Sequence, residues 1–455
     1  MKLGLIDIIV IAVYFLAMVI IGLYVSKKTS GTKKDDFLLA GRKLSLPLFV
    51  ASLVATWYGS ILGVGEFVYN SGVVAWISFG LPYYIAAALF GGFLAGKIRD
   101  MGFSSIPEQL EYYYGRKAGI ISAIIILLIT IPSAYILMLG VIIQLFSGWE
   151  LWISIIFGTI LSLVYLFTGG FRADIYTNSA QFILMFVGFI LLFIFSYHHF
   201  GFVDENLARL PSKHLSPLGG LSWQYVLSWY IIAFQTFVDP SFHQRCAAAR
   251  SPKIARNGVF ISILFWALFD FLTLSAGLYA KARLPEIEPM MAFPLLGELV
   301  LPPFVKGIFV VSMLATIMST LNSYSFISGV TIGRDLLHKY LKGSEEFKIR
   351  IGLLISSIMA IILAISIPSA VDLIYKTSSI AIPGLIIPLT LTYFNSKLLN
   401  SKDSITILIS TTIIALIFSI YKNDLIKVGF DFEPMFPAII FAGILSIILI
   451  YKNKK

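Results

Sequence analysis

The chain has a single cysteine, Cys246, among 455 residues, and only 13% of its residues are charged. One cysteine excludes an intrachain disulfide and a zinc site built from several thiolates. Soluble domains are about 25% charged, and this chain has too little charge to cover a fold whose composition is 58% hydrophobic. The composition therefore excludes a soluble enzyme, a disordered chain and a secreted disulfide-linked scaffold.

Several motifs that carry chemistry are also missing. No phosphate-binding loop of the G-x-x-x-x-G-K-[ST] type occurs, which argues against an ATP-driven pump. The five histidines fall at the edges of apolar segments, and no paired catalytic groups stand at membrane depth. We therefore expect no enzyme activity, no histidine metal site and no organic cofactor.

Long apolar segments dominate the chain instead. A spanning helix needs about 20 mostly apolar residues, and thirteen segments meet this requirement. They cover roughly 5–26, 47–69, 73–96, 118–146, 150–168, 177–197, 222–244, 256–280, 303–333, 349–367, 373–394, 404–421 and 434–451. The sequence therefore predicts an all-α integral membrane protein.

The basic residues predict its orientation. With the N-terminus outside, most of the Lys and Arg residues fall in cytoplasmic segments, as the positive-inside rule requires. The net charge of +10 then reflects this bias, so we expect the lipid bilayer as a partner and no nucleic acid. The short loops suit a prokaryotic inner membrane with a cytoplasmic C-terminus, and no obligate protein partner is evident.

Two of the predicted spans contain helix-breaking residues. The second carries three glycines in seven residues, Gly59 to Gly65, followed by Glu66. The seventh contains Asp239-Pro240, and proline disfavours a helical residue before it. Matching broken helices mark the sites of transporters built from inverted repeats. The alternative is packing glycines and a proline kink in an ordinary bundle.

The ninth span carries a polar face. Thr316, Ser319, Asn322 and Ser323 lie on one side of a helix, with Thr320 at its edge. Hydroxyl and carbonyl oxygens suit a small hard cation. They suit hydrogen bonding between membrane helices equally well, so the residues alone leave both interpretations open.

Five stretches together resemble the sodium:solute symporter family over roughly residues 1–395. They are DFLLAGR at 36–42, the small-residue break of the second span ending in FVY at 67–69, GGFRADIYTNSAQ at 169–181, QRCAAA at 244–249, and MSTLNS at 318–323 leading to RD at 334–335. The likeness implies an inverted repeat of five plus five helices, with the second and seventh discontinuous. It also implies sodium-driven uptake by alternating access, with sodium as the only metal.

The resemblance implies the following organisation. An N-terminal peripheral helix and inner loop cover 1–46, the first five-helix repeat 47–199, an outer loop 200–221, the second repeat 222–395, and two peripheral helices 396–455. The implied sodium ligands are the carbonyls of Leu53, Thr56 and Thr316 and the hydroxyls of Ser319 and Thr320.

One position departs from the family pattern. Asn178 stands where the family usually has an aspartate that assists sodium coupling at the inner side. Asp174, one helical turn earlier, is a candidate substitute. The departure leaves a proton-coupled symporter, or a passive facilitator or channel on the same scaffold, as the alternative to sodium coupling.

The resemblance places the solute between the two broken helices. The matching residues are Trp57, Ser60, Gly63, Glu66, Gln235, Asp239, Tyr375 and Lys376. Lys376 suggests a small amino acid or carboxylate, although it could instead pair with Asp372. The sequence names no solute. Arg245 is expected to act as an inner-loop anchor to lipid headgroups or as part of an inner gate.

Overall fold

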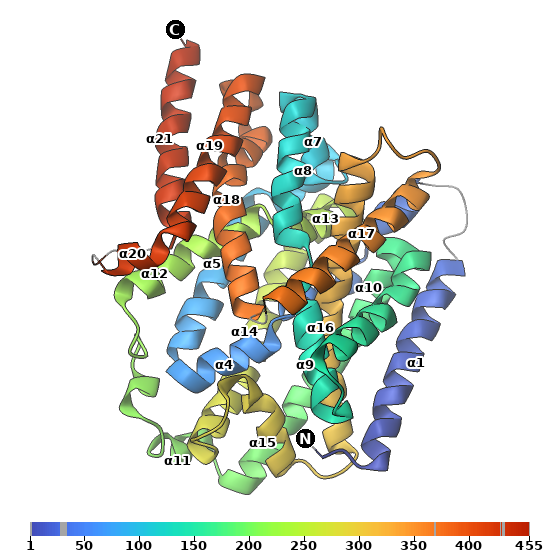
Figure 1. Cartoon of the computed structure of the whole chain (residues 1–455), viewed down its shortest axis with the longest axis vertical. Coiled ribbons are helices and arrows are strands. Elements are labelled where there is room, and N and C mark those ends of the chain that lie inside the picture. The colour runs from blue at the N-terminus through green and yellow to red at the C-terminus, as the bar shows by residue number, and fades with distance from the viewer. Residues whose placement is uncertain (1, 28–33, 368–369, 428, 430–432, 455) are drawn as a thin grey trace.

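A computed structural model describes residues 2–27, 34–367, 370–427, 429 and 433–454 (Figure 1). The described residues are almost entirely helical, with one isolated bridge between Leu44 and Ala249. The longer helices are α1 (Leu5–Lys27), α3 (Leu46–Trp57), α4 (Ile61–Ser71), α5 (Leu81–Phe93), α8 (Arg116–Thr130), α9 (Ser133–Ser147), α10 (Leu151–Phe200), α12 (Trp223–Ile232), α14 (Pro252–Arg283), α16 (Val305–Val330), α17 (Glu345–Ser366), α18 (Ala370–Phe394), α19 (Ser401–Ile420) and α21 (Met435–Lys454).

Shorter helices connect them. These are α2 (Lys34–Leu39), α6 (Ala95–Met101), α7 (Ile106–Tyr114), α11 (Val203–Leu207), α13 (Pro240–Ala248), α15 (Ala292–Val300) and α20 (Lys422–Lys427), together with the π-helical turns η2 (Trp76–Gly80) and η6 (Thr331–Leu336) and the 3-10 turn η4 (Ala233–Phe237).

The predicted count of thirteen spans is not confirmed. Ten described helices are long and apolar enough to cross a membrane, or eleven if the bent pair α3 and α4 counts as one span. The two remaining segments are a short apolar helix at Leu151–Val164 and the interrupted series α12, η4 and α13. The all-helical class and the membrane-spanning character are confirmed.

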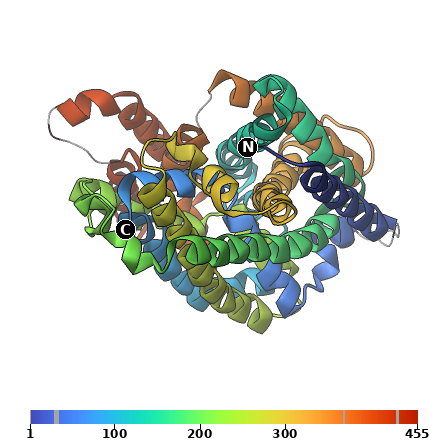
Figure 2. The ribbon, with the colours of Figure 1, turned by 90° about the horizontal axis from the view of Figure 1, so that it is seen from below.

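Burial separates a central helix from peripheral ones. The span containing α16 is 83% buried within the protein, whereas those of α19 and α21 are 28% and 22% buried. Seen from below, α1 and the red C-terminal helices lie at opposite edges of the molecule (Figure 2). A helix this buried must satisfy its polar residues through other helices, so α16 is placed to build a site.

Both predicted helix breaks are present. The axes of α3 and α4 differ by 57° across Tyr58–Ser60. In the seventh predicted span, α12 is followed by the 3-10 turn η4, helical structure stops before Asp239, and Pro240 begins α13. The Asp239 carboxylate accepts hydrogen bonds from the first amides of α13, as an N-cap does. A proline at the first helical position needs no amide hydrogen, which makes this a stable restart.

The segment 169–176 differs from expectation. The sequence pattern places it between two spans, but the structure continues α10 through it with one bend at Gly170 (φ 56°, ψ −148°). A Cβ at this position would lie 2.7 Å from the ring of Phe37. Because the following residues Phe171, Ala173 and Asp174 are fully buried, tertiary packing holds them in helical form.

Candidate ion and solute site

The end of α3 supplies free backbone carbonyls to the centre of the protein. The last carbonyls of a helix have no partner within it. Two hydroxyls of α16 meet them: Ser319 Oγ donates to the carbonyl of Ala55 at 2.7 Å, and Thr320 Oγ1 donates to the carbonyl of Thr56 at 2.7 Å. Both hydroxyls are buried. The break between α3 and α4 therefore places carbonyl oxygen atoms directly against the polar face of α16.

Four of the five predicted sodium ligands gather at this contact. Ser319 also donates to the carbonyl of Thr316 at 2.9 Å, so three residues of α16 and Thr56 of α3 lie together. Leu53 lies one turn earlier on α3. Ala55, which the resemblance did not include, contributes a further carbonyl. The donor set consists of neutral oxygens, which fits a small hard cation.

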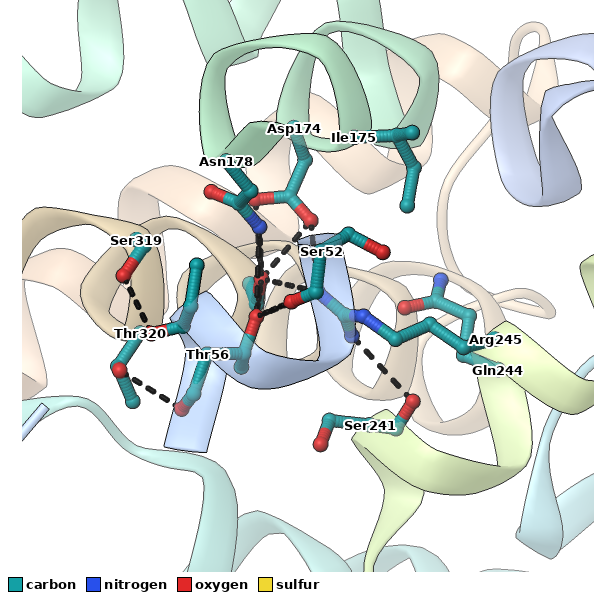
Figure 3. A network of polar contacts seen from close by, with 12 residues as sticks. Ser52, Thr56, Asp174, Ile175, Asn178, Ser241, Gln244, Arg245, Ser319 and Thr320 are labelled. Carbon is teal, nitrogen blue, oxygen red and sulfur yellow. Dashed lines mark hydrogen bonds and ion pairs between the residues drawn. The ribbon is translucent and has the colours of Figure 1, made fainter. Parts of the chain in front are cut away.

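A buried ion pair lies beside this contact. Arg245 of α13 and Asp174 of α10 are both fully buried, with Nη2 and Oδ2 3.4 Å apart. Arg245 Nη2 also donates to Thr56 Oγ1 at 2.6 Å and to Ser323 Oγ at 2.9 Å. Figure 3 shows Arg245 reaching from α13 toward Thr56 and the α10 side chains. One guanidinium thus joins α3, α10, α13 and α16.

Asn178 belongs to the same network. Its Nδ2 donates to Thr56 Oγ1 at 3.3 Å and to Ser323 Oγ at 3.0 Å. Ser323 in turn donates to Asp174, with its Oγ 2.8 Å and 3.0 Å from the two carboxylate oxygens. The carboxylate of Asp174 therefore reaches the same hydroxyl as the Asn178 amide. Its predicted role as a substitute for the family aspartate stays a prediction.

Arg245 was expected either to anchor an inner loop to lipid headgroups or to form part of an inner gate. Its guanidinium is fully buried, which excludes contact with lipid headgroups, and its role in a gate stays a prediction. The sequence held a signal for this burial. Arg245 follows Pro240 by only five residues, and a helix that restarts at Pro240 begins within the predicted span 222–244. Arg334 forms a separate ion-pair cluster, with Nη2 2.6 Å from Glu108 Oε2 and Nε 3.1 Å from Glu345 Oε1.

A cavity of about 330 Å³ opens beside Thr56. Of the residues predicted to contact the solute, five line it: Trp57, Ser60, Gly63, Glu66 and Gln235. The cavity also reaches Ser378 and Ser379 of α18. Because Thr56 lines the cavity and contacts α16, the candidate ion and solute sites share a residue.

The structure does not place the other three predicted solute contacts, Asp239, Tyr375 and Lys376, in the cavity lining. Asp239 is not part of the cavity lining. Besides capping α13, its carboxylate accepts a hydrogen bond from Tyr324 Oη at 2.7 Å, and Tyr324 does line the cavity. Tyr375 and Lys376 belong to α18, but their side chains lie outside the described residues.

Comparisons with known proteins agree with this architecture. A model of the sodium:solute symporter family matches residues 37–409. The high-affinity choline transporter 1 of Drosophila melanogaster is 23% identical over 96% of this chain and 76% of its own length. The sodium/pantothenate symporter of Escherichia coli K12 is 25% identical over 68% of each chain. A solved Na⁺-coupled sialic acid symporter, in a substrate-bound outward-open state, shares the fold with a TM-score of 0.81 at 18% identity, covering 98% of this chain and 97% of its own.

Proposed function

Because the chain belongs to the sodium:solute symporter family, we propose that it imports a small organic solute together with sodium by alternating access. The observation that carries this proposal is the direct contact between the broken end of α3 and the hydroxyls of α16, beside a cavity that shares Thr56 with it. The named relatives take different solutes, choline and pantothenate, so kinship alone selects none.

The proposed ion site uses oxygens from both helices. Its ligands are the carbonyls of Leu53, Thr56 and Thr316 and the hydroxyls of Ser319 and Thr320. Asp174 and Asn178 act on the inner side of this site, where they hold Ser323 and, through Asp174, balance the charge of Arg245. The solute site comprises Trp57, Ser60, Gly63, Glu66 and Gln235, with Asp239, Tyr375 and Lys376 retained as predicted contacts.

In the proposed transport cycle, sodium and solute each stabilise a particular conformation of the protein. Sodium bound between α3 and α16 favours the state in which these helices are in contact, with the cavity reached from outside. Solute then binds, and the broken helices tilt against the others. Coupling requires only that each ligand prefer one state. In this proposal the N-terminus is outside and the C-terminus is cytoplasmic.

The test is the effect of sodium on thermal unfolding of the purified protein. A ligand that binds only the folded state raises its melting point. We expect sodium, but not potassium, to do so. We expect Ser319→Ala and Thr320→Ala each to raise the half-saturating sodium concentration at least about tenfold, because each removes an oxygen from a charged contact.

Ser446→Ala is the matched control. Ser446 is also buried and bonds a backbone carbonyl of its own helix, but it lies in peripheral α21. An unchanged sodium response in the Ser319→Ala/Thr320→Ala double variant would contradict the proposed ion site. Stabilisation by acidification instead of sodium would indicate proton coupling.

A further inference from the structure

The wall of the cavity contains a continuous series of aromatic rings. Trp57 lies 5.0 Å from Tyr83, and Phe79 lies 6.4 Å from Tyr83 and 4.2 Å from Trp229, measured between ring centroids. Phe67 extends the series, 5.5 Å from Phe79. These five rings come from α3, α4, α5, α12 and η2, so the fold gathers them from separate elements.

The charges of the same wall are of one sign. Among the described residues that line the cavity there is no Lys, Arg or His, whereas Glu66 and Asp270 are both present. An aromatic face carries partial negative charge and attracts cations. Rings and carboxylates therefore favour the same kind of ligand.

The two acids differ in their partners. Asp270 accepts hydrogen bonds from the hydroxyls of Tyr58, at 2.8 Å, and Tyr84, so protein donors already satisfy it. Glu66 receives no hydrogen bond and forms no ion pair within the described part of the chain. A carboxylate within a membrane-spanning segment is costly unless a partner compensates its charge. Glu66 is thus the acid left to meet a ligand.

We infer that the solute is an organic cation of the alkylammonium class, held between the aromatic rings of the cavity with its charge facing Glu66. The inference rests on the proposed function and specifies the solute of the same site. A desolvated ammonium is attracted to each ring that it faces, and an alkylated ammonium also buries its methyl groups against the rings. The sequence alone, through Lys376, suggested a small amino acid or carboxylate.

Three probes of nearly equal shape separate the charge classes. These are choline, its uncharged carbon isostere 3,3-dimethylbutan-1-ol, and the anion 3,3-dimethylbutanoate. With saturating sodium, we expect choline to raise the melting point further and the other two to leave it unchanged. Equal or greater stabilisation by the alcohol or the anion would overturn the inference.

Variants of the wall test the assignment by residue. We expect Trp229→Leu and the nearly isosteric Glu66→Gln each to raise the half-saturating choline concentration about tenfold, while the shift caused by sodium alone persists and shows that the protein is folded. Trp149→Leu, which removes an exposed tryptophan outside the cavity, is the control. An unchanged choline response in both wall variants would overturn the inference.

The same assay distinguishes failure of the inference from failure of the proposed function. If sodium stabilises the protein but tetramethylammonium, choline and benzyltrimethylammonium do not, the solute is not an alkylammonium cation, and sodium coupling stands. If sodium itself has no effect, the proposed ion site fails first.

Discussion

Replacing Gly59 by alanine tests whether close contact between α3 and α16 builds the ion site. Gly59 lies in the break after α3, directly against Thr320. A Cβ at position 59 would lie 2.4 Å from Thr320 Cβ and 2.5 Å from its Oγ1. Carbon atoms in ordinary contact are about 3.5–4.0 Å apart, so the helices would have to separate by about 1 Å.

The size of the effect follows from this overlap. Overpacking of a tight core costs about 1–3 kcal/mol. The overlapping atoms belong to Thr320, whose hydroxyl is 2.7 Å from the Thr56 carbonyl. Moving α16 away from α3 therefore increases the distance between these two proposed sodium ligands. Because 1.4 kcal/mol corresponds to a factor of ten in affinity, we expect Gly59→Ala to raise the half-saturating sodium concentration about tenfold to hundredfold.

The assay is sodium-dependent thermal stability, followed by sodium-dependent solute uptake into proteoliposomes. Gly92→Ala in α5 is the matched control, because no atom lies within 4 Å of the Cβ it would add. We expect that variant to keep its sodium response and to lose no stability, since alanine favours helix. If Gly59→Ala binds sodium as tightly as the unmodified protein, the reasoning about the α3–α16 contact is refuted.

Two further predictions concern charge. Asp174→Asn leaves the buried Arg245 guanidinium without its ion partner, so we expect the free energy of unfolding to fall by about 3–5 kcal/mol in denaturant titrations. The Asp174→Asn/Arg245→Gln double variant should recover part of this loss. Full stability of the single variant would contradict the pairing. Burial raises the pKa of Glu108, but the Arg334 guanidinium beside it outweighs this and holds the pKa below its ordinary value. The stability from this pair is therefore fully present above about pH 4.3 and lost as pH falls through the lowered pKa. We expect Glu108→Gln to lower the melting point slightly at pH 7 and by progressively less as the pH falls below about 4.3, and a difference that does not shrink with falling pH would contradict this reasoning.

Local sequence signals predicted the parts of the fold that local chemistry decides. Pro240 and the glycines around Gly59 predicted the two helix breaks, because both residue types act on their own backbone. The polar side of the ninth span indicated either an ion site or hydrogen bonds between helices, and the family resemblance paired Ser319 and Thr320 with the first broken helix. The organisation into repeats and terminal helices, by contrast, stays a prediction.

Features set by packing between distant segments were not predicted. The predicted spans ended at 168 and resumed at 177, yet the segment is helical beyond the bend at Gly170, where Phe171 and Asp174 are buried. Arg245 was counted with the loop charges, because its partner Asp174 lies 71 residues away in the chain. The capping role of Asp239, by contrast, could be predicted from the sequence, since aspartate before proline is typical of a helix start.

The hydrogen bonds from Ser319 and Thr320 to the α3 carbonyls also bear on how tightly transport is coupled. They join the two helices through the Ser319 and Thr320 hydroxyls, which belong to the proposed sodium ligands. Each such bond contributes about 1 kcal/mol, so the empty carrier can keep the same contact closed without sodium. A carrier that closes without its ion can change state with solute alone, which is slippage. In the proposed symporter, the leak of uncoupled solute therefore depends on how much more strongly sodium stabilises the α3–α16 contact than these two hydrogen bonds do.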